Sequence, residues 1–131
     1  MRSKKKPEHY VDNKEFLRAL SDYKYFVKKA LTEETTRPRI PNYIGECFLK
    51  IAQHLSYRPN FINYPFREDM ISDGIENCVQ YIDNFDPNRG NPFAYFTQII
   101  YFAFIRRIQK EKKNLYIKYK MSENVNVFDQ T

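Results

Sequence analysis

The stretch that decides the fold lies near the middle of the chain, where residues 69–96 read DMISDGIENCVQYIDNFDPNRGNPFAYF. Apolar residues recur here at steps of three and four: Ile71, Ile75, Cys78, Ile82 and Phe85. That period is typical of one buried face of a helix, which we predict over about residues 66–84. After a turn rich in Asn, Asp, Pro and Gly, Asn91 can cap and Pro92 can open a further helix over about 92–113.

Two more amphipathic helices are predicted upstream of this stretch. The first, over about 13–31, can be capped by Asp12 or Asn13, and its apolar face holds Phe16, Leu20, Tyr23, Val27 and Leu31. The second lies near 42–56, between two linkers that contain prolines, and its apolar face holds Ile44, Phe48, Ile51 and Leu55.

These patterns predict an all-α fold, with four main helices in a single compact domain over residues 13–113. A basic tail precedes the domain at residues 1–12. Residues 114–131 form a C-terminal extension whose apolar residues show no clear period, so we expect it to extend the last helix briefly and then fray. The length of 131 residues is near the commonest domain size, and only three glycines argue against a turn-rich β architecture.

The charge and the cysteines narrow the class of protein. A formal net charge of +6 favours a polyanionic partner, such as nucleic acid or an anionic membrane surface. No apolar run reaches the roughly 18 residues needed to span a bilayer, and the charged N-terminus lacks the apolar stretch of a signal peptide. We therefore expect a soluble intracellular protein, in which Cys47 and Cys78 are reduced thiols of the core.

The predicted third helix has an acidic stripe opposite its apolar face, formed by Asp69, Asp73, Glu76, Gln80 and Asp83. A charged helix face is often merely solvated, and that interpretation stays open. However, no Lys or Arg occurs between Arg67 and Arg89 of this basic chain, which favours a surface for a cationic partner. Gly74 lowers the stability of this helix by about 1 kcal/mol relative to Ala. Its presence favours a close approach by another helix at this position over a glycine that is merely tolerated.

The predicted fourth helix is apolar nearly all round. Its core face would hold Phe93, Phe96, Ile100, Ala103 and Ile108. Other large residues cannot all fit that face, namely Tyr95, Ile99, Tyr101, Phe102 and Phe104. The helix is therefore either central in the core or presents rings outward. Because Arg106, Arg107, Lys110, Lys112 and Lys113 follow directly, the pattern resembles the rings and cations that hold single-stranded nucleic acid.

Nothing in the sequence predicts catalysis, a metal site or a cofactor. His9 and His54 lie in different segments, and there is no His-Glu-x-x-His motif, paired Cys-x-x-Cys motif or glycine-rich phosphate loop. Carboxylates strung along one helix face do not converge on a metal ion. We therefore expect a protein that acts by binding rather than an enzyme.

Three short stretches resemble region 2 of bacterial sigma factors. Residues 69–74 (DMISDG), then residues 83–90 (DNFDPNRG), then Phe93 follow the family pattern D-L-I-Q-E-G, D-x-F-(D/E)-x-x-x-G and an aromatic helix. Residues 10–15 (YVDNKE) and 91–98 (NPFAYFTQ) are similar, more narrowly, to the late-transcription sigma factors of tailed phages.

This resemblance implies roles for two surfaces. In sigma region 2 an acidic helix packs on the β′ subunit of core RNA polymerase, a contact that would fall here to Asp69, Ser72, Asp73, Glu76 and Gln80. The following loop and helix read and melt the −10-type promoter element. The DNA-binding residues would then be Asp86, Arg89, Asn91, Tyr95, Phe96, Ile99 and Ile100, with Arg106, Arg107 and Lys110 as cations for DNA.

The chain departs from the family in two ways. Ile99 and Ile100 stand where housekeeping sigma factors have two tryptophans, so Tyr95 or Tyr101 would have to supply stacking. There is no room for a C-terminal helix-turn-helix domain, a lack shared by phage late factors, which rely on a co-activator and a sliding clamp. Residues 125–129 (VNVFD) resemble only weakly the short, acidic and hydrophobic tail with which those factors bind the clamp.

The expected function is therefore that of a sigma factor for phage late promoters, acting in the cytoplasm of an infected bacterium. Two rival classes stay open. One is a regulator that occupies the sigma site on polymerase without reading DNA, and the other is a helical DNA-binding protein with a purely structural role.

Overall fold

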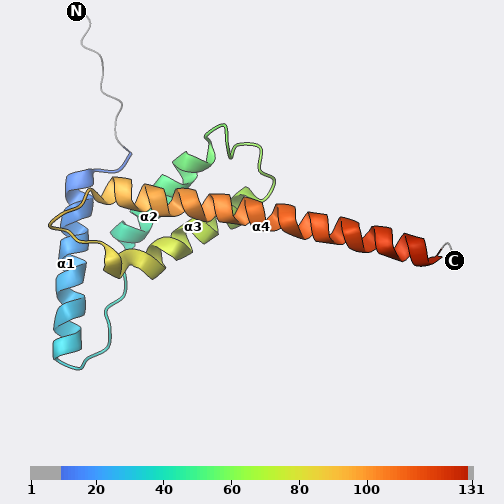
Figure 1. Cartoon of the computed structure of the whole chain (residues 1–131). Helices are drawn as coiled ribbons and strands as arrows, with labels where there is room; N and C mark the ends of the chain where they lie inside the picture. The colour runs from blue at the N-terminus through green and yellow to red at the C-terminus, as the bar shows by residue number, and fades with distance from the viewer. Residues whose placement is uncertain (1–9, 130–131) are drawn as a thin grey trace, which may run out of the picture.

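A computed structural model describes the backbone of residues 10–129 and the side chains of residues 10–123. Over this range the chain forms α1 (Asn13–Thr32), α2 (Asn42–Ser56), α3 (Arg67–Tyr81), the short 3-10 helix η1 (Ile82–Asn84) and α4 (Pro92–Asp129). The predicted all-α fold with four main helices in one compact domain is confirmed. Figure 1 shows the first half of α4 lying along α2 and α3, with α1 crossing at one end and the second half of α4 projecting away.

Two of the helices, α1 and α4, begin at caps that the sequence predicts. Asp12 caps α1, because its carboxylate accepts the backbone N–H groups of the second and third residues of that helix at 3.0 and 3.3 Å. Asn91 caps α4 by accepting the N–H of Ala94 at 3.1 Å. Asn13 joins these two helix starts, since its amide donates to Asn91 at 2.9 Å and accepts the N–H of Phe93 at 3.1 Å.

Three fully buried phenylalanines from three helices form the centre of the core. The ring centroids of Phe48 on α2 and Phe96 on α4 lie 4.7 Å apart. Phe16 on α1 lies 5.6 Å from Phe96 and 6.1 Å from Phe48, all within the range for favourable aromatic pairs. This ring cluster holds α1, α2 and α4 together around one point.

The predicted core faces are largely confirmed. All four apolar residues of the α2 face are buried, as are Ile71, Cys78, Ile82 and Phe85 of the third stripe. Leu31 was wrongly assigned to the core and is 80% exposed, because the last turn of α1 lies beyond the helices on which it packs (Figure 1). Met70 and Phe104 are fully buried although neither lies on a predicted stripe. Since α3 packs on both α2 and α4, its buried face is wider than a single stripe.

Gly74 lies at a close contact between α3 and α4. A Cβ atom at this position would lie 3.0 Å from Ile100 Cγ2 and 3.0 Å from Phe104 Cε1. Both of those side chains are fully buried and have little freedom to move aside. The predicted close approach of another helix to Gly74 is therefore confirmed.

The last helix is longer than the sequence pattern indicates, because α4 continues past residue 113 to Asp129. Residues 114–129 contain no Gly or Pro, so nothing in them breaks the helix. Leu115 and Tyr119 are 66% and 61% exposed on this projecting part. No other helix of the described residues packs beside this part of α4, which explains why the sequence shows no apolar period there (Figure 1). Within the described residues, no helix has the length and apolar character required to cross a membrane.

Two glycines inside helices give a matched test of the packing between α3 and α4. A Cβ atom added at Gly45 of α2 would have no neighbour within 4 Å, so Gly45→Ala should stabilise the protein by about 0.5–1 kcal/mol through helix propensity alone. Gly74→Ala should instead destabilise it by about 1–3 kcal/mol, since overpacking outweighs the same gain. Urea unfolding followed by circular dichroism measures both. Stabilisation by Gly74→Ala would contradict the close contact.

Candidate functional site

The acidic face of α3 consists of the five residues expected to contact polymerase: Asp69, Ser72, Asp73, Glu76 and Gln80. Four of them are exposed, and Asp73 is partly exposed. Gly74 and Cys78 are buried on the opposite side of the helix, against α4. The packing of α3 thus turns the acidic face toward solvent.

Asp73 is engaged by a cation of the neighbouring helix. Arg107 Nε donates to Asp73 Oδ2 at 2.6 Å, and Arg107 NH1 donates to Glu111 Oε1 at 2.9 Å. These three side chains are 25–35% exposed, and ion pairs of this partly exposed kind contribute about 1 kcal/mol or less. The structure thus brings together two residues that the sequence assigns to different partners, Asp73 to polymerase and Arg107 to DNA.

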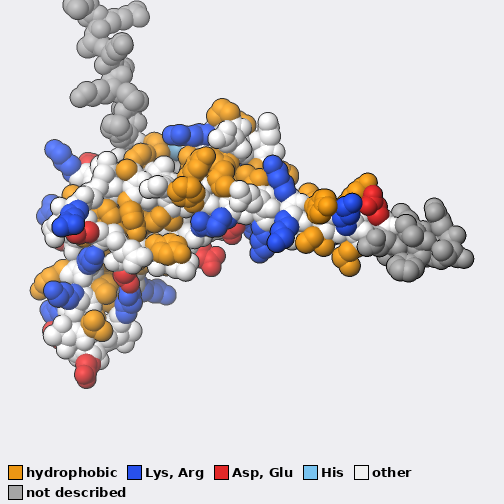
Figure 2. Space-filling model, in the orientation of Figure 1, with side chains coloured by type: hydrophobic (Ala, Val, Ile, Leu, Met, Phe, Trp, Pro, Cys, Tyr) orange, Lys and Arg blue, Asp and Glu red, His pale blue; other side chains and the backbone are white. Residues whose placement is uncertain are grey.

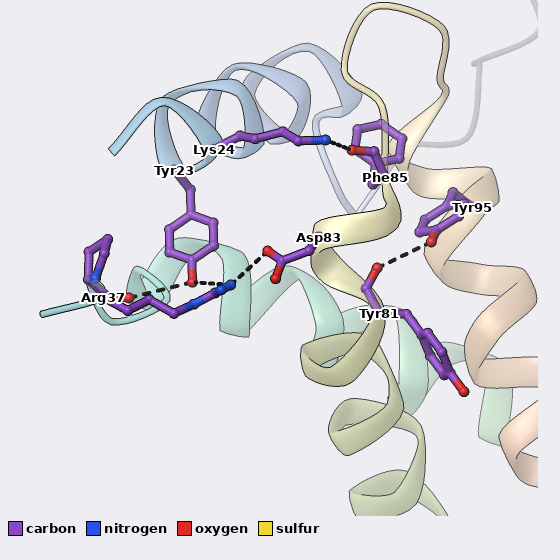
Figure 3. Close-up of polar contacts among 8 residues, drawn as sticks. Tyr23, Lys24, Arg37, Tyr81, Asp83, Phe85 and Tyr95 are labelled. Carbon is purple, nitrogen blue, oxygen red and sulfur yellow. Dashed lines mark hydrogen bonds and ion pairs between the residues drawn. The ribbon is translucent and has the colours of Figure 1, made fainter. Parts of the chain in front are cut away.

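Asp83, the last member of the predicted acidic stripe, is also paired. Arg37, in the linker after α1, donates to Asp83 Oδ1 at 2.7 Å and to the Tyr23 hydroxyl at 3.3 Å (Figure 3). The sequence did not indicate this pair, because its members are 46 residues apart. Both pairs offset a charge of the predicted stripe without covering it, since the side chains of Asp83 and Asp73 stay 54% and 35% exposed.

The loop between η1 and α4 is held in one shape by contacts within it and from α1. Asp86 accepts the N–H of Asn88 at 2.9 Å with its carboxylate and the N–H of Arg89 at 3.2 Å with its carbonyl. A Cβ atom at Gly90 would collide with the ring of Phe85. Lys24 Nζ of α1 donates to the Phe85 carbonyl at 2.6 Å (Figure 3). The loop residues expected at DNA, namely Asp86, Arg89 and Asn91, are exposed on this fixed frame.

The structure contradicts two of the residues expected to contact DNA. Phe96 and Ile100 are fully buried, Phe96 in the ring cluster and Ile100 against Gly74. Central burial thus accounts for these side chains, as it does for Phe104. The apolar period of α4 predicts both on its core face, which is confirmed, whereas the resemblance, carried over by position alone, assigns them to DNA.

Tyr95 and Ile99 lie at the edge of the core and are half-buried. The Tyr95 hydroxyl donates to the Tyr81 carbonyl at 3.2 Å, and its ring packs 5.2 Å from that of Phe85 (Figure 3). Burial raises the pKa of Tyr95, so the hydroxyl stays a neutral donor at physiological pH. Of the rings that did not fit the core face, Phe102 is the one most open to solvent, at 48%.

A polar hollow of about 390 Å³ lies between α3 and α4, next to the pair formed by Asp73 and Arg107. Arg106 and Lys110 line it and are exposed, and Arg106 NH2 donates to Asn77 Oδ1 at 3.0 Å. These two cations are open to a phosphate, whereas Arg107 would first have to leave its carboxylates. Figure 2 shows Lys and Arg side chains gathered along this part of α4 and over α1.

The thiols and carboxylates offer little reactive chemistry. Cys47 and Cys78 are free and buried, and burial raises the pKa of both thiols, so neither is a thiolate at neutral pH. Within residues 10–123, whose side chains are described, no group of His, Cys, Asp and Glu side chains is arranged to hold a metal ion. His54 stacks on the ring of Tyr10, with centroids 3.7 Å apart, and His9 lies outside the described residues.

Several residues that shape these surfaces were not singled out from the sequence. Lys24 and Arg37 act across long separations, and no local pattern points to such pairs. Tyr25 and Phe26 could have been found from the sequence, because neither lies on the apolar face of α1. They are 62% and 53% exposed, as large apolar residues off a core face would be.

The burial of Phe96 and Ile100 predicts a loss of stability when either is truncated. Phe96→Ala should lower the free energy of unfolding by about 3–5 kcal/mol and Ile100→Ala by about 2–5 kcal/mol. Tyr95→Phe, which removes one hydrogen bond at the core edge, should cost only about 1 kcal/mol. Urea denaturation measures all three. A Phe96→Ala variant as stable as the wild type would contradict the core assignment.

The chain matches no protein-family model and no curated protein sequence. Three surfaces of the protein bear on its function. These are the acidic face of α3, the loop from Asp86 to Asn91, and the exposed cations of α4.

Proposed function

We propose that this protein is a small sigma factor that binds bacterial core RNA polymerase and directs it to promoter DNA. The acidic face of α3 would contact the β′ subunit, and the loop from Asp86 to Asn91, with the cations of α4, would contact the −10-type element. By its resemblance to phage late factors, the protein would act in the cytoplasm of an infected bacterium and would direct transcription from late promoters.

The exposure of the acidic face is the observation that carries this proposal. Asp69, Glu76 and the neutral Gln80 stay open to solvent although the chain has a net charge of +6, and α3 itself carries no Lys or Arg after Arg67. Val79 is 45% exposed beside them and adds an apolar contact. An acidic helix face with an apolar edge is complementary to a basic amphipathic helix, the kind of partner expected on polymerase.

The DNA contact rests on the fixed loop and on two cations. Arg89 and Asn91 are exposed on a loop already ordered by its own hydrogen bonds, so little entropy is lost when it docks. Arg106 and Lys110 line the hollow between α3 and α4, where they can neutralise phosphates. The role in melting falls on Tyr95 and Ile99 at the core edge, because Phe96 and Ile100 are buried.

Two further partners are proposed from the resemblance to phage late factors alone. These are a phage co-activator and a sliding clamp, on which phage late factors rely. The segment that faintly resembles a clamp-binding tail, residues 125–129, forms the end of α4, but its side chains lie outside the described residues.

One observation favours the rival function of a regulator that occupies the sigma site without reading DNA. Arg107, expected at DNA, is held by Asp73 and Glu111 at 2.6 and 2.9 Å. A protein that only binds polymerase would have no need for free cations on α4. The exposure of Arg106 and Lys110 argues for the DNA-reading function instead.

Charge reversal on the acidic face tests the polymerase contact. Asp69→Lys combined with Glu76→Lys should reduce co-purification with core RNA polymerase by more than tenfold, because both side chains are exposed and would repel a cationic partner. Asp73 is left unchanged, since it pairs with Arg107. The matched control reverses two exposed carboxylates elsewhere, Glu33→Lys with Glu46→Lys, and should bind normally. Equal binding by both double variants would refute the contact.

The salt dependence of DNA binding separates the two candidate functions. Each phosphate contact contributes about one unit to the slope of log affinity against log salt. Arg106→Ala with Lys110→Ala should therefore reduce that slope by about two for the polymerase complex on promoter DNA. The same complex should also lose promoter-dependent transcription. Unchanged slope and transcription would favour a regulator that does not read DNA.

A further inference from the structure

The solvent-facing side of α1, to which the proposed function assigns no role, forms one wall of a groove. Ser21, Lys24, Tyr25 and Lys28 recur at steps of three, one and three, so they share one face of the helix. Together with Asp86, Pro87 and Asn88 they line a hollow of about 500 Å³ between α1 and the loop before α4. The groove therefore lies beside the loop expected to read DNA.

Tyr25 is the prominent side chain of this groove. Its ring is 62% exposed and packs edge-on against Phe26, at 5.5 Å between centroids. Tyr25 and Lys28 also line a second hollow farther along α1, with Lys29 and Thr32. The tyrosine thus stands between two hollows and is not covered by the core, which makes it accessible to a planar group.

The opposite wall of the groove is fixed in place. Lys24 Nζ holds the Phe85 carbonyl at 2.6 Å, and the Asp86 carboxylate accepts the N–H of Asn88 at 2.9 Å. The Asn88 side chain is exposed at this wall. An amide can both donate and accept hydrogen bonds, as the edge of a nucleobase requires.

We propose that this groove binds an unpaired nucleotide of single-stranded DNA, an inference that rests on the proposed function. The Tyr25 ring stacks on the base, Lys28 and Lys24 neutralise the flanking phosphates, and Asn88 contacts the base edge. A base in a duplex is covered on both faces by its neighbours, so a ring of this kind selects unpaired bases. The groove supplies the stacking surface that Phe96 and Ile100 cannot offer, since both are buried.

The absence of tryptophan from the chain permits a direct test. Tyr25→Trp introduces a single indole at an exposed position while keeping a stacking ring. An oligothymidylate of about ten nucleotides should quench its fluorescence, and a duplex containing the same strand should quench it several-fold less. The control is Tyr57→Trp, because Tyr57 is 60% exposed but lies outside the groove. No quenching at position 25, or equal quenching at both positions, would overturn the proposal.

Affinity gives the second measurement. Tyr25→Ala with Lys28→Ala should weaken binding of the same oligothymidylate by about tenfold or more, measured by fluorescence anisotropy, whereas Tyr57→Ala should not. Unchanged affinity in the double variant would also overturn the proposal. Polymerase binding is followed separately by co-purification. Quenching without polymerase binding would refute the sigma function and leave the groove supported, and polymerase binding without quenching would do the reverse.

Discussion

The contact between Gly74 of α3 and the side chains of Ile100 and Phe104 on α4 is the constraint on which the remaining surfaces depend. With no side chain at Gly74, α4 can lie directly against α3 and bury its own large residues there. The same contact fixes the rotation of both helices about their axes. It turns the acidic face of α3 toward solvent and brings Arg107 within hydrogen-bonding distance of Asp73.

This arrangement explains why two surfaces of opposite charge can share so small a domain. The exposed carboxylates begin at Asp69 and continue to Glu76, while Arg106 and Lys110 lie across the hollow between α3 and α4. The two surfaces meet at the pair formed by Asp73 and Arg107. A cationic partner that engaged Asp73 would compete with Arg107 for it, so binding on α3 and binding of phosphates on α4 are not independent.

The loop before α4 connects these surfaces with α1. Its shape is set by hydrogen bonds of Asp86, by the packing of Gly90 under Phe85, and by Lys24 reaching across from α1. Asn13 ties the starts of α1 and α4 together in the same region. The part of the molecule proposed to meet the promoter is therefore a rigid junction of two helix ends and a loop, which limits the entropy lost on binding.

The sequence by itself determined the four helices, a cap at Asp12 or Asn13 and another at Asn91, the buried face of α2 and the position of the acidic face, because all of these follow from periods and motifs within one segment. It also indicated the close approach at Gly74. The apolar pattern of α4 also predicted Phe96 and Ile100 on the core face. Only the tertiary structure decided that Phe104, predicted off that face, is buried as well, since α4 is apolar nearly all round. The pairing of Asp73 with Arg107 and the groove beside Tyr25 likewise depend on residues far apart in the chain, whose contacts arise only when the helices pack.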